Sequence, residues 1–369
     1  MHARVLGALA RPLVGHLDPE FLALMDDTKR MLREVFETKH ELTFPISGTG
    51  SAGMEACLVN LLEPGDTAVV CVNGEFGRRM ADIAERCGAR VVAVDVEWGR
   101  AVSPDDVKKA LAGVASPKLV AVVHAETSTG ALSPVEEIAP VVRASGALLV
   151  VDTVTSLGGL PVRIDEWGVD ACYSGTQKCL SCPPGLAPVT FSDRARAAIR
   201  ARKTKVASWY LDVSMIEKYW GAERVYHHTA PISMSYALAE ALRIVLEEGL
   251  PARFARHRRN HLALAAGLEA LGFVFVVEPI GRLPMLNSVF LPDGIEEAPL
   301  RRQLLEETGI EVGGGLGPFK GKIWRIGLMG ESSRIGKVLG LLSALETMMP
   351  GRCAPGAAVA AAQRAASST

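Results

Sequence analysis

The sequence has no apolar run that approaches the roughly 18 residues needed to span a bilayer. It also has no surplus of charge, because 40 Lys and Arg residues balance 41 Asp and Glu residues and leave a net charge of -1. A chain without a basic surplus has no bulk electrostatic attraction to nucleic acid or to anionic lipid. We therefore expect neither a nucleic acid nor a membrane as a partner.

Cysteine is present at an odd count of seven in a long chain, which argues against a disulfide framework and for a reducing compartment. Cys179-x-x-Cys182 is the one pair with redox or metal spacing, and a zinc ribbon would need a second such pair. No metal is expected. The first residues lack the shape of a signal peptide and the last carry no organelle address, so the expected location is the cytoplasm.

Short apolar segments alternate with amphipathic helical segments from about residue 42 to about residue 195. The central segments are nearly continuous Val, Leu and Ala runs, as in strands covered by helices on both faces. This alternation predicts an α/β doubly wound sheet. The predicted strands are LTFPIS, TAVVCV, RVVAVDV, KLVAVVHA, ALLVVD, ACYSG and APVTFS.

The pattern changes after Pro231, where long helical segments are followed by a few short strands, which predicts a smaller α+β domain. The tail is rich in Ala, Pro and Ser and has few large apolar residues, so we expect it to be disordered. The expected division is an N-terminal arm at 1–20, a large domain at 21–231, a connecting helix at 232–250, a small C-terminal domain at 251–350 and a tail at 351–369.

A glycine-rich turn at residues 48–53 has the G-x-G-x-x-G spacing of dinucleotide-binding folds. Such a site needs an acidic residue about 20 positions further on to hold the ribose. The residue at that distance is Asn73, so the ribose anchor is missing. What remains is a helix N-terminus with free N–H groups and the hydroxyls of Thr49 and Ser51, which suits a single phosphate. Gly53 is then expected only to help the helix pack.

Two charged residues follow predicted strands further along the chain. Asp152 ends a buried strand, and Lys178 comes 26 residues later in a turn of small residues. A carboxylate can pair with a pyridinium nitrogen, and a lysine can form a Schiff base with the same cofactor. With the phosphate cup at Gly50, these residues predict a pyridoxal 5'-phosphate site. Solvated surface charges are the alternative reading of both.

Several motifs, in order along the chain, resemble those of the class V pyridoxal-phosphate aminotransferases of the alanine–glyoxylate and serine–pyruvate (serine–glyoxylate) type. They are SGTGSAGMEACLVNLLEPGD, VDTVTSLGG, YSGTQKCLSCPPG, YHHTAP and RIGLMG, and the resemblance runs from about Val5 to Met349. It implies the fold-type I architecture, with a mostly parallel seven-stranded sheet in the large domain and a smaller α+β C-terminal domain. It also implies a homodimer with shared active sites.

The resemblance assigns roles around the cofactor ring. Lys178 would form the Schiff base, with Gln177 as a ring-side hydrogen-bond donor. Asp152 would pair with the pyridine nitrogen. Val154 would pack on one face of the ring and Phe76, which stands where relatives often have Trp, on the other.

It also assigns roles at the phosphate. Thr49, Gly50 and Ser51 would cradle this group. Tyr226 and Thr229 would reach it from the second subunit.

The implied reaction is a ping-pong transamination, in which a small amino acid such as alanine or serine passes its amino group to glyoxylate or pyruvate. Lys178 would move the α-proton, and Arg325 would clamp the substrate α-carboxylate in a bidentate fork. Thr127 would place a hydroxyl near the ring and the substrate. Related ureidoglycine–glyoxylate enzymes carry Asn where this chain has Tyr226, which favours alanine or serine as donor.

Other activities stay open at this stage. A cysteine desulfurase-like lyase would need a mobile cysteine, for which Cys353 is the candidate. Ureidoglycine–glyoxylate transamination is another possibility. Relatives usually carry a Gly-Pro-Gly-Pro-like segment before the region of Val5, and its absence here suggests a truncated arm or a cofactor-binding protein with reduced activity. Cys179 and Cys182, near the lysine, suggest sensitivity to oxidation.

Overall fold

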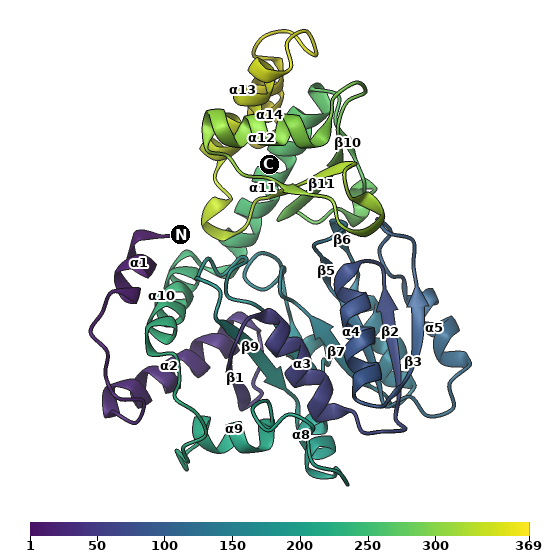
Figure 1. The fold of residues 1–369 in the computed structure, drawn as a ribbon, viewed down its shortest axis with the longest axis vertical. Helices are drawn as coiled ribbons and strands as arrows, with labels where there is room; N and C mark the ends of the chain where they lie inside the picture. The colour runs from purple at the N-terminus through teal and green to yellow at the C-terminus, as the bar shows by residue number, and fades with distance from the viewer. Residues whose placement is uncertain (369) are drawn as a thin grey trace.

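The computed structural model describes residues 1–368. A seven-stranded sheet forms the centre of the large domain, in the order β1-β9-β8-β7-β4-β2-β3 (Figure 1). The strands from β8 to β3 run parallel, whereas β9 is antiparallel to both β8 and β1. The strands are β1 (Leu42–Ser47), β2 (Thr67–Val72), β3 (Arg90–Asp95), β4 (Leu119–Val123), β7 (Leu148–Asp152), β8 (Ala171–Tyr173) and β9 (Leu186–Phe191). The prediction of a mostly parallel seven-stranded sheet is confirmed.

Helices cover the sheet because its central strands are apolar on both faces, and every residue of β4 and β7 is buried. Helices α3 and α4 pack together in front of the sheet in Figure 1, and α5 and α6 form a second pair. The helices of this domain are α1 (Ala3–Leu9), α2 (Pro19–Val35), α3 (Gly50–Leu61), α4 (Glu75–Arg86), α5 (Pro104–Ala112), α6 (Val135–Ala144), α7 (Ile164–Trp167), α8 (Asp193–Arg200) and α9 (Val213–Trp220).

Helix α3 lies very close to the sheet, and Gly53 makes this possible. A Cβ atom at this position would lie 3.0 Å from the Cβ of Ala187 and 3.1 Å from the Cβ of Tyr173. Both contacts are tighter than ordinary packing distances, so a larger side chain would push the helix outward. The third glycine of the G-x-G-x-x-G pattern therefore serves helix packing.

The expected N-terminal arm contains helix α1, which packs against α10 (Ile232–Glu248). Arg4 on α1 forms ion pairs of 2.5 Å with Glu240 and Glu247 on α10. Helix α10 leads into α11 (Leu250–Ala270), and the chain turns between them at Gly249, whose φ is +79°. A glycine tolerates this left-handed φ without strain.

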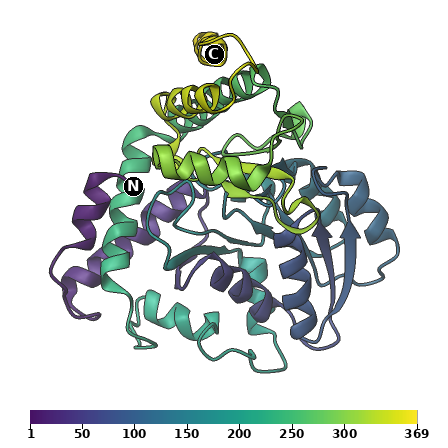
Figure 2. The same cartoon turned by 45° about the horizontal axis from the view of Figure 1, so that its top comes forward.

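The small domain lies above the large domain in Figure 1 and comes forward in Figure 2. Its sheet is antiparallel and has the order β10-β11-β13-β12. Leu264, Trp324 and Leu342 lie in its separate hydrophobic core. Its elements are β10 (Val274–Phe275), β11 (Leu286–Phe290), α12 (Glu297–Thr308), β12 (Gly313–Gly314), β13 (Ile323–Gly327) and α13 (Ile335–Met348), with short 3₁₀ turns at Pro279–Gly281, Gly317–Phe319 and Gly330–Ser332.

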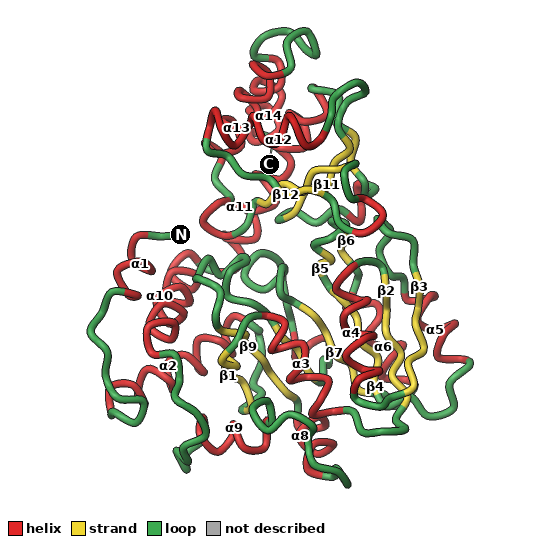
Figure 3. The backbone as a smooth tube through the Cα atoms, in the orientation of Figure 1, coloured by secondary structure: helices red, strands yellow, loops and turns green. Residues whose placement is uncertain are grey.

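The prediction of a disordered tail is wrong for residues 357–367, which form helix α14 (Ala357–Ser367), red in Figure 3. Ala358 and Ala362, one helical turn apart, are fully buried where α14 packs on α11. The Glu346 carboxylate accepts hydrogen bonds from the backbone N–H groups of Gly356 and Ala358 at 2.9 and 2.7 Å. Small alanine faces let two helices approach closely, so this segment packs without large apolar residues.

A two-stranded hairpin, β5 (Ala125–Glu126) and β6 (Ala131–Leu132), lies between the two domains. Within residues 1–368 there is no helix long and apolar enough to cross a membrane. The same residues hold no cluster of three or more His, Cys, Asp or Glu side chains that could bind a metal ion. All seven cysteines are unpaired thiols.

Packing of α14 on α11 can be tested with Ala362→Asp. The substitution places an unpaired carboxylate against α11, and we expect it to lower the free energy of unfolding by about 1–3 kcal/mol. Gln363→Asp, which adds the same charge at the exposed neighbouring position, should change stability little. Urea denaturation measures both. Equal stabilities of the two variants would show that α14 does not pack on α11.

Candidate functional site

The predicted residues gather at the carboxyl ends of the parallel strands, where open α/β sheets bind ligands. Asp152 ends β7, and Lys178 lies in the turn after β8. Helix α3 begins beside them, since a Cβ atom on Gly50 would lie 3.1 Å from Val154 Cγ2 and 3.6 Å from the Cα of Gly175. The start of α3, the Asp152 carboxylate and Lys178 thus all lie at the carboxyl ends of the parallel strands.

Asp152 is held by two hydrogen bonds in a buried place. Its Oδ2 accepts from the Tyr173 hydroxyl at 2.8 Å, and its Oδ1 accepts from the Val154 N–H at 2.8 Å. Burial raises the pKa of this carboxyl to about 7, although both hydrogen bonds act in the opposite direction. A cationic ring nitrogen placed against this carboxylate would compensate its buried charge.

Tyr173 is a residue that the sequence analysis missed. It lies directly opposite Asp152 in the parallel pairing of β7 with β8. Neighbouring residues in such a register point to the same face of the sheet. The predicted strands ALLVVD and ACYSG could have revealed the pair, had their register been worked out.

Lys178 is partly buried, and its pKa is lowered, first by burial and then by the positive charge of Arg325. A lowered pKa leaves more of the amine unprotonated, which a nucleophilic lysine needs. Gln177 beside it is exposed, and its Oε1 lies 2.9 Å from where a Cβ atom on Gly175 would be. Val154 Cγ1 lies 3.3 Å from the same point, so the Gln177 amide is on the side of the turn where Val154 lies.

The start of α3 is built to receive an anion. Thr49 occupies the N-cap position, and its side chain makes no capping hydrogen bond, so the hydroxyl is free for a ligand. Ser51 lies exposed in the first turn, where backbone N–H groups have no partner within the helix. Because a Cβ atom at Gly50 would lie 3.1 Å from Val154, glycine lets the start of α3 approach the lysine turn closely. These features fit pyridoxal phosphate.

Arg325 on β13 is directed at the site from the small domain. Its Nε donates to the Gly314 carbonyl at 2.8 Å and its Nη1 to the Thr127 carbonyl at 3.3 Å, and its Nη2 has no hydrogen-bond partner among the described residues. Strand β13 lies between β11 and β12, so this guanidinium is not a charge on a sheet edge. Its free N–H groups can receive a carboxylate beside Lys178.

Phe76 and Thr127 complete the half of the site that lies near Arg325. Phe76 lies in the first turn of α4 and is partly buried, with the Arg79 guanidinium 5.1 Å from its ring centroid. The Thr127 hydroxyl is buried and accepts a long hydrogen bond of 3.5 Å from Thr155. Glu126, which the sequence analysis missed, accepts from the Phe76 N–H at 3.2 Å.

Tyr226 and Thr229 lie on a surface segment of the chain, and no contact joins them to Thr49, Gly50 or Ser51 of the same chain. The Tyr226 side chain is 56% exposed, and its hydroxyl lies 3.4 Å from the Thr229 hydroxyl. Next to them, His228 Nε2 lies 2.6 Å from the Ser47 hydroxyl. This contact holds the segment that carries Tyr226 and Thr229 beside Ser47, two residues before Thr49.

The cysteines offer little reactivity. Burial raises the pKa of Cys179 to about 11 and that of Cys182 to about 12, so both are buried, protonated thiols. Since the thiolate is the reactive form, the hypothesis of an oxidation-sensitive pair is not supported. Cys353 packs against the core of the small domain instead of extending on a mobile loop.

Two buried histidines near these groups are accounted for by packing. His124 Nδ1 lies 2.9 Å from the Ser156 hydroxyl, and burial lowers its pKa to about 4. The rings of His227 and His228 meet at 2.8 Å between their Nδ1 atoms, and His227 stacks on Trp209.

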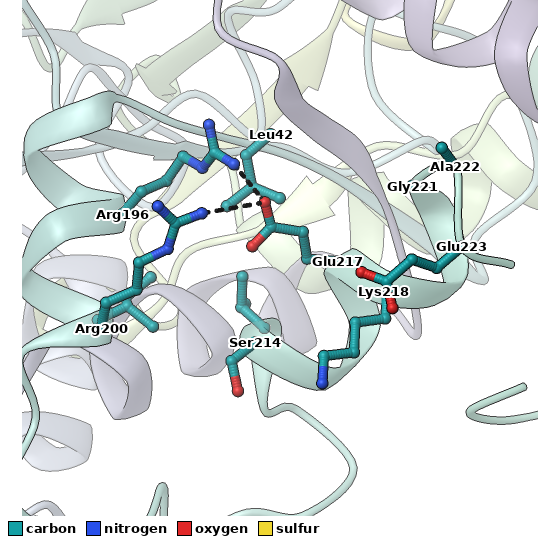
Figure 4. A pocket seen from close by; sticks show the side chains of 11 residues that line it. Leu42, Arg196, Arg200, Ser214, Glu217, Lys218, Gly221, Ala222 and Glu223 are labelled. Carbon is teal, nitrogen blue, oxygen red and sulfur yellow. Dashed lines mark hydrogen bonds and ion pairs between the residues drawn. The ribbon is translucent and has the colours of Figure 1, made fainter. Parts of the chain in front are cut away.

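A separate cavity of about 430 Å³ lies at the opposite edge of the sheet (Figure 4). It includes Leu42, which begins β1 and pairs with the last residue of β9. Arg196 and Arg200 point toward Glu217, which pairs with both. Both guanidinium groups share this one carboxylate, and none of the residues predicted for the site lines the cavity.

Comparisons with known proteins agree over almost the whole chain. The family model described as Aminotransferase class-V matches residues 3–318. The (S)-ureidoglycine–glyoxylate transaminase of Bacillus subtilis is 42% identical over 364 residues, which cover 94% of this chain and 87% of that protein. The alanine–glyoxylate aminotransferase of Callithrix jacchus is 42% identical over 331 residues, covering 89% and 80%. A crystal structure of alanine–glyoxylate aminotransferase from Nostoc sp. has a TM-score of 0.92 and 50% identity, covering 94% of this chain and 92% of that one.

The buried state of Asp152 predicts a pH dependence of stability. Its pKa is about 7 in the folded protein and about 4 in an unfolded chain. The folded form therefore binds the proton more tightly, and the stability that Asp152 contributes is present below the unfolded pKa and lost as pH rises through the folded pKa. Between about pH 4 and about pH 7, the free energy of unfolding of the cofactor-free protein should fall more steeply than that of Asp152→Asn.

Urea denaturation of both proteins across this range measures the difference. Other groups titrate in both proteins alike, so comparison with Asp152→Asn isolates this carboxyl. Parallel pH profiles would mean that Asp152 is already ionised in the folded protein at low pH.

Proposed function

Because this chain belongs to the class V aminotransferases, which use pyridoxal 5'-phosphate, we propose that it transfers the amino group of alanine or serine to glyoxylate or pyruvate by a ping-pong mechanism. The observation that carries the proposal is the convergence of Asp152, Lys178 and the Arg325 fork at one edge of the sheet. Asp152 suits the ring nitrogen of the cofactor, Lys178 suits the Schiff base, and Arg325 suits the carboxylate of the amino acid.

The chain's own groups have distinct tasks in this reaction. Arg325 binds the α-carboxylate of the substrate and orients its α-carbon. When bound, the cofactor supplies a conjugated ring that accepts the electrons left by the α-proton. Lys178, whose pKa is lowered, takes that proton and returns it. Asp152 keeps a proton on the ring nitrogen, because its carboxylate is fixed by Tyr173 and Val154.

The rest of the cofactor would be held as the sequence motifs suggest. Thr49, Gly50 and Ser51 receive the phosphate at the N-terminus of α3. Val154 packs on one face of the ring and Phe76 on the other. Gln177, whose amide lies beside Gly175, would donate to the ring side, and Thr127 would lie near the substrate.

The hydrogen bonds of Arg253, a second arginine near the lysine turn, favour a small amino donor. Arg253 donates to the Gly158 carbonyl at 2.8 Å, to the Cys179 carbonyl at 2.5 Å and to the Glu248 carboxylate at 2.5 Å. With its N–H groups committed to these acceptors, Arg253 cannot serve a distal carboxylate. A donor with one carboxylate, such as alanine or serine, then suffices.

Ureidoglycine is the second candidate donor, since the relative from Bacillus subtilis carries this substrate in its name. Tyr226 favours alanine or serine, because the ureidoglycine–glyoxylate enzymes look to carry Asn at the matching position. A desulfurase activity is not favoured, because Cys353 packs against the small-domain core. The seven unpaired cysteines support a location in the cytoplasm.

We also propose a homodimer whose active sites are shared. Trp209, Tyr210, Val225 and Tyr226 are large apolar or aromatic side chains exposed on the same region of the chain. Such a surface is typical of a protein interface. Across a two-fold axis, Tyr226 and Thr229 of one subunit would reach the phosphate cup of the other.

The activity is tested with purified protein and pyridoxal phosphate. Alanine and glyoxylate should give pyruvate, and Lys178→Ala should reduce kcat by at least about a thousandfold, since both covalent attachment and proton transfer depend on this amine. Serine and ureidoglycine are assayed in parallel. A protein that borohydride links to the cofactor at Lys178, yet that forms no 2-oxo acid from alanine or from serine, would contradict the proposed reaction and leave cofactor binding intact.

Co-expression of two inactive variants tests whether the two subunits share their active sites. Lys178→Ala and Tyr226→Ala each leave homodimers with two damaged sites. In a mixed dimer one site carries both defects and the other carries neither, so co-expression should restore about a quarter of the wild-type activity. Activity no higher than the mean of the separate variants would contradict a shared site.

A further inference from the structure

A buried carboxylate that takes no part in the proposed chemistry lies between the two halves of the site. Glu126 is 0% exposed and accepts four hydrogen bonds. Oε1 accepts from the N–H and the hydroxyl of Ser128 at 3.0 and 2.6 Å. Oε2 accepts from the N–H groups of Phe76 and Gly77 at 3.2 and 3.4 Å. Burial raises the pKa of this carboxyl, and the four donors act in the opposite direction by favouring the carboxylate form.

The same carboxylate closes the N-terminus of α4. Gly74, at the N-cap of this helix, has no side chain to satisfy the first N–H groups. Glu126 and Ser128 take over that role, since the Ser128 hydroxyl also accepts from the Glu75 N–H at 2.9 Å. A Cβ atom on Gly74 would lie 2.4 Å from the Glu126 side chain, so glycine is required for the two segments to meet. A negative charge at this end of a helix is favourable.

The loop that carries Glu126 is fixed on its other side to the small domain. The next residue, Thr127, accepts through its carbonyl from Arg325 Nη1. The Gly130 carbonyl accepts from the Leu283 N–H at 3.0 Å, and Ala131 bridges to Arg282. Loop 126–131 therefore links the helix that carries Phe76 with the strand that carries Arg325.

We propose that Glu126 is a positioning residue, which sets the spacing between the Phe76 ring and the Arg325 fork and so couples cofactor binding to recognition of the substrate carboxylate. Only the part of this inference that concerns the substrate carboxylate rests on the proposed function. The other part concerns cofactor binding at the Phe76 turn, and the Kd for pyridoxal phosphate tests it without any substrate.

Glu126→Gln tests the inference. The amide side chain keeps the shape of the carboxylate but loses its charge. Its N–H groups would face the Ser128 N–H and hydroxyl, which donate to Glu126 in the wild-type protein. We expect the Kd of the cofactor-free protein for pyridoxal phosphate and the KM for the amino donor each to rise about tenfold, as for the loss of one hydrogen bond to a charged group. The kcat should change less, because Lys178 and Asp152 are untouched.

Two further variants complete the design. Asp82→Asn removes an exposed carboxylate from the same helix, where Asp82 pairs with the exposed Arg86, and should leave both constants unchanged. Ser128→Ala removes the hydroxyl that joins Glu126 to the Glu75 N–H and should shift both constants in the same direction as Glu126→Gln, by a smaller factor.

Thermal unfolding of the cofactor-free proteins separates positioning from stability. A Glu126→Gln protein that unfolds at a lower temperature but keeps the wild-type Kd and KM would overturn the inference and leave only a structural cap. If the wild-type protein transaminates no donor, the proposed function fails, while a raised Kd for pyridoxal phosphate in Glu126→Gln would still support the positioning role.

Discussion

Everything in the site is arranged around one carboxylate that the fold keeps away from water. Asp152 lies at the end of a strand whose residues are all buried, and two hydrogen bonds fix both of its oxygens. Burial makes its negative charge costly unless a cation is placed against it. A protonated pyridine ring would bring the positive charge that compensates the buried carboxylate. Asp152 would therefore favour this cofactor, and binding of the cofactor would stabilise Asp152.

The two domains contribute complementary halves. The large domain supplies the phosphate cup, Asp152 and Lys178, while the small domain supplies Arg325. The positive charge of Arg325 also lowers the pKa of Lys178, so the group that we propose to bind the substrate helps to keep the lysine unprotonated. Loop 126–131 touches both halves, and its buried Glu126 links the cofactor side to the substrate side.

Sequence patterns predicted the features that depend on local order. Continuous apolar runs predicted the seven strands, and Asp152 and Lys178 could be recognised because each follows such a strand. Tyr173 and Glu126 were missed because their roles depend on register and on contacts between distant segments, which a single strand pattern does not contain. Helix α14 was missed for a different reason, since Ala358 and Ala362 pack through their small size and not through a recognisable apolar stripe.

Arg253 has a consequence for motion. It lies near the start of α11, and its bonds to the carbonyls of Gly158 and Cys179 tie that helix to the turn that carries Lys178. Separation at this point would leave a buried guanidinium and two buried carbonyls without partners, which is costly. Any swing of the small domain must therefore pivot close to the lysine. Arg325 belongs to the same domain, so such a swing would change the distance between its guanidinium and the Lys178 amine.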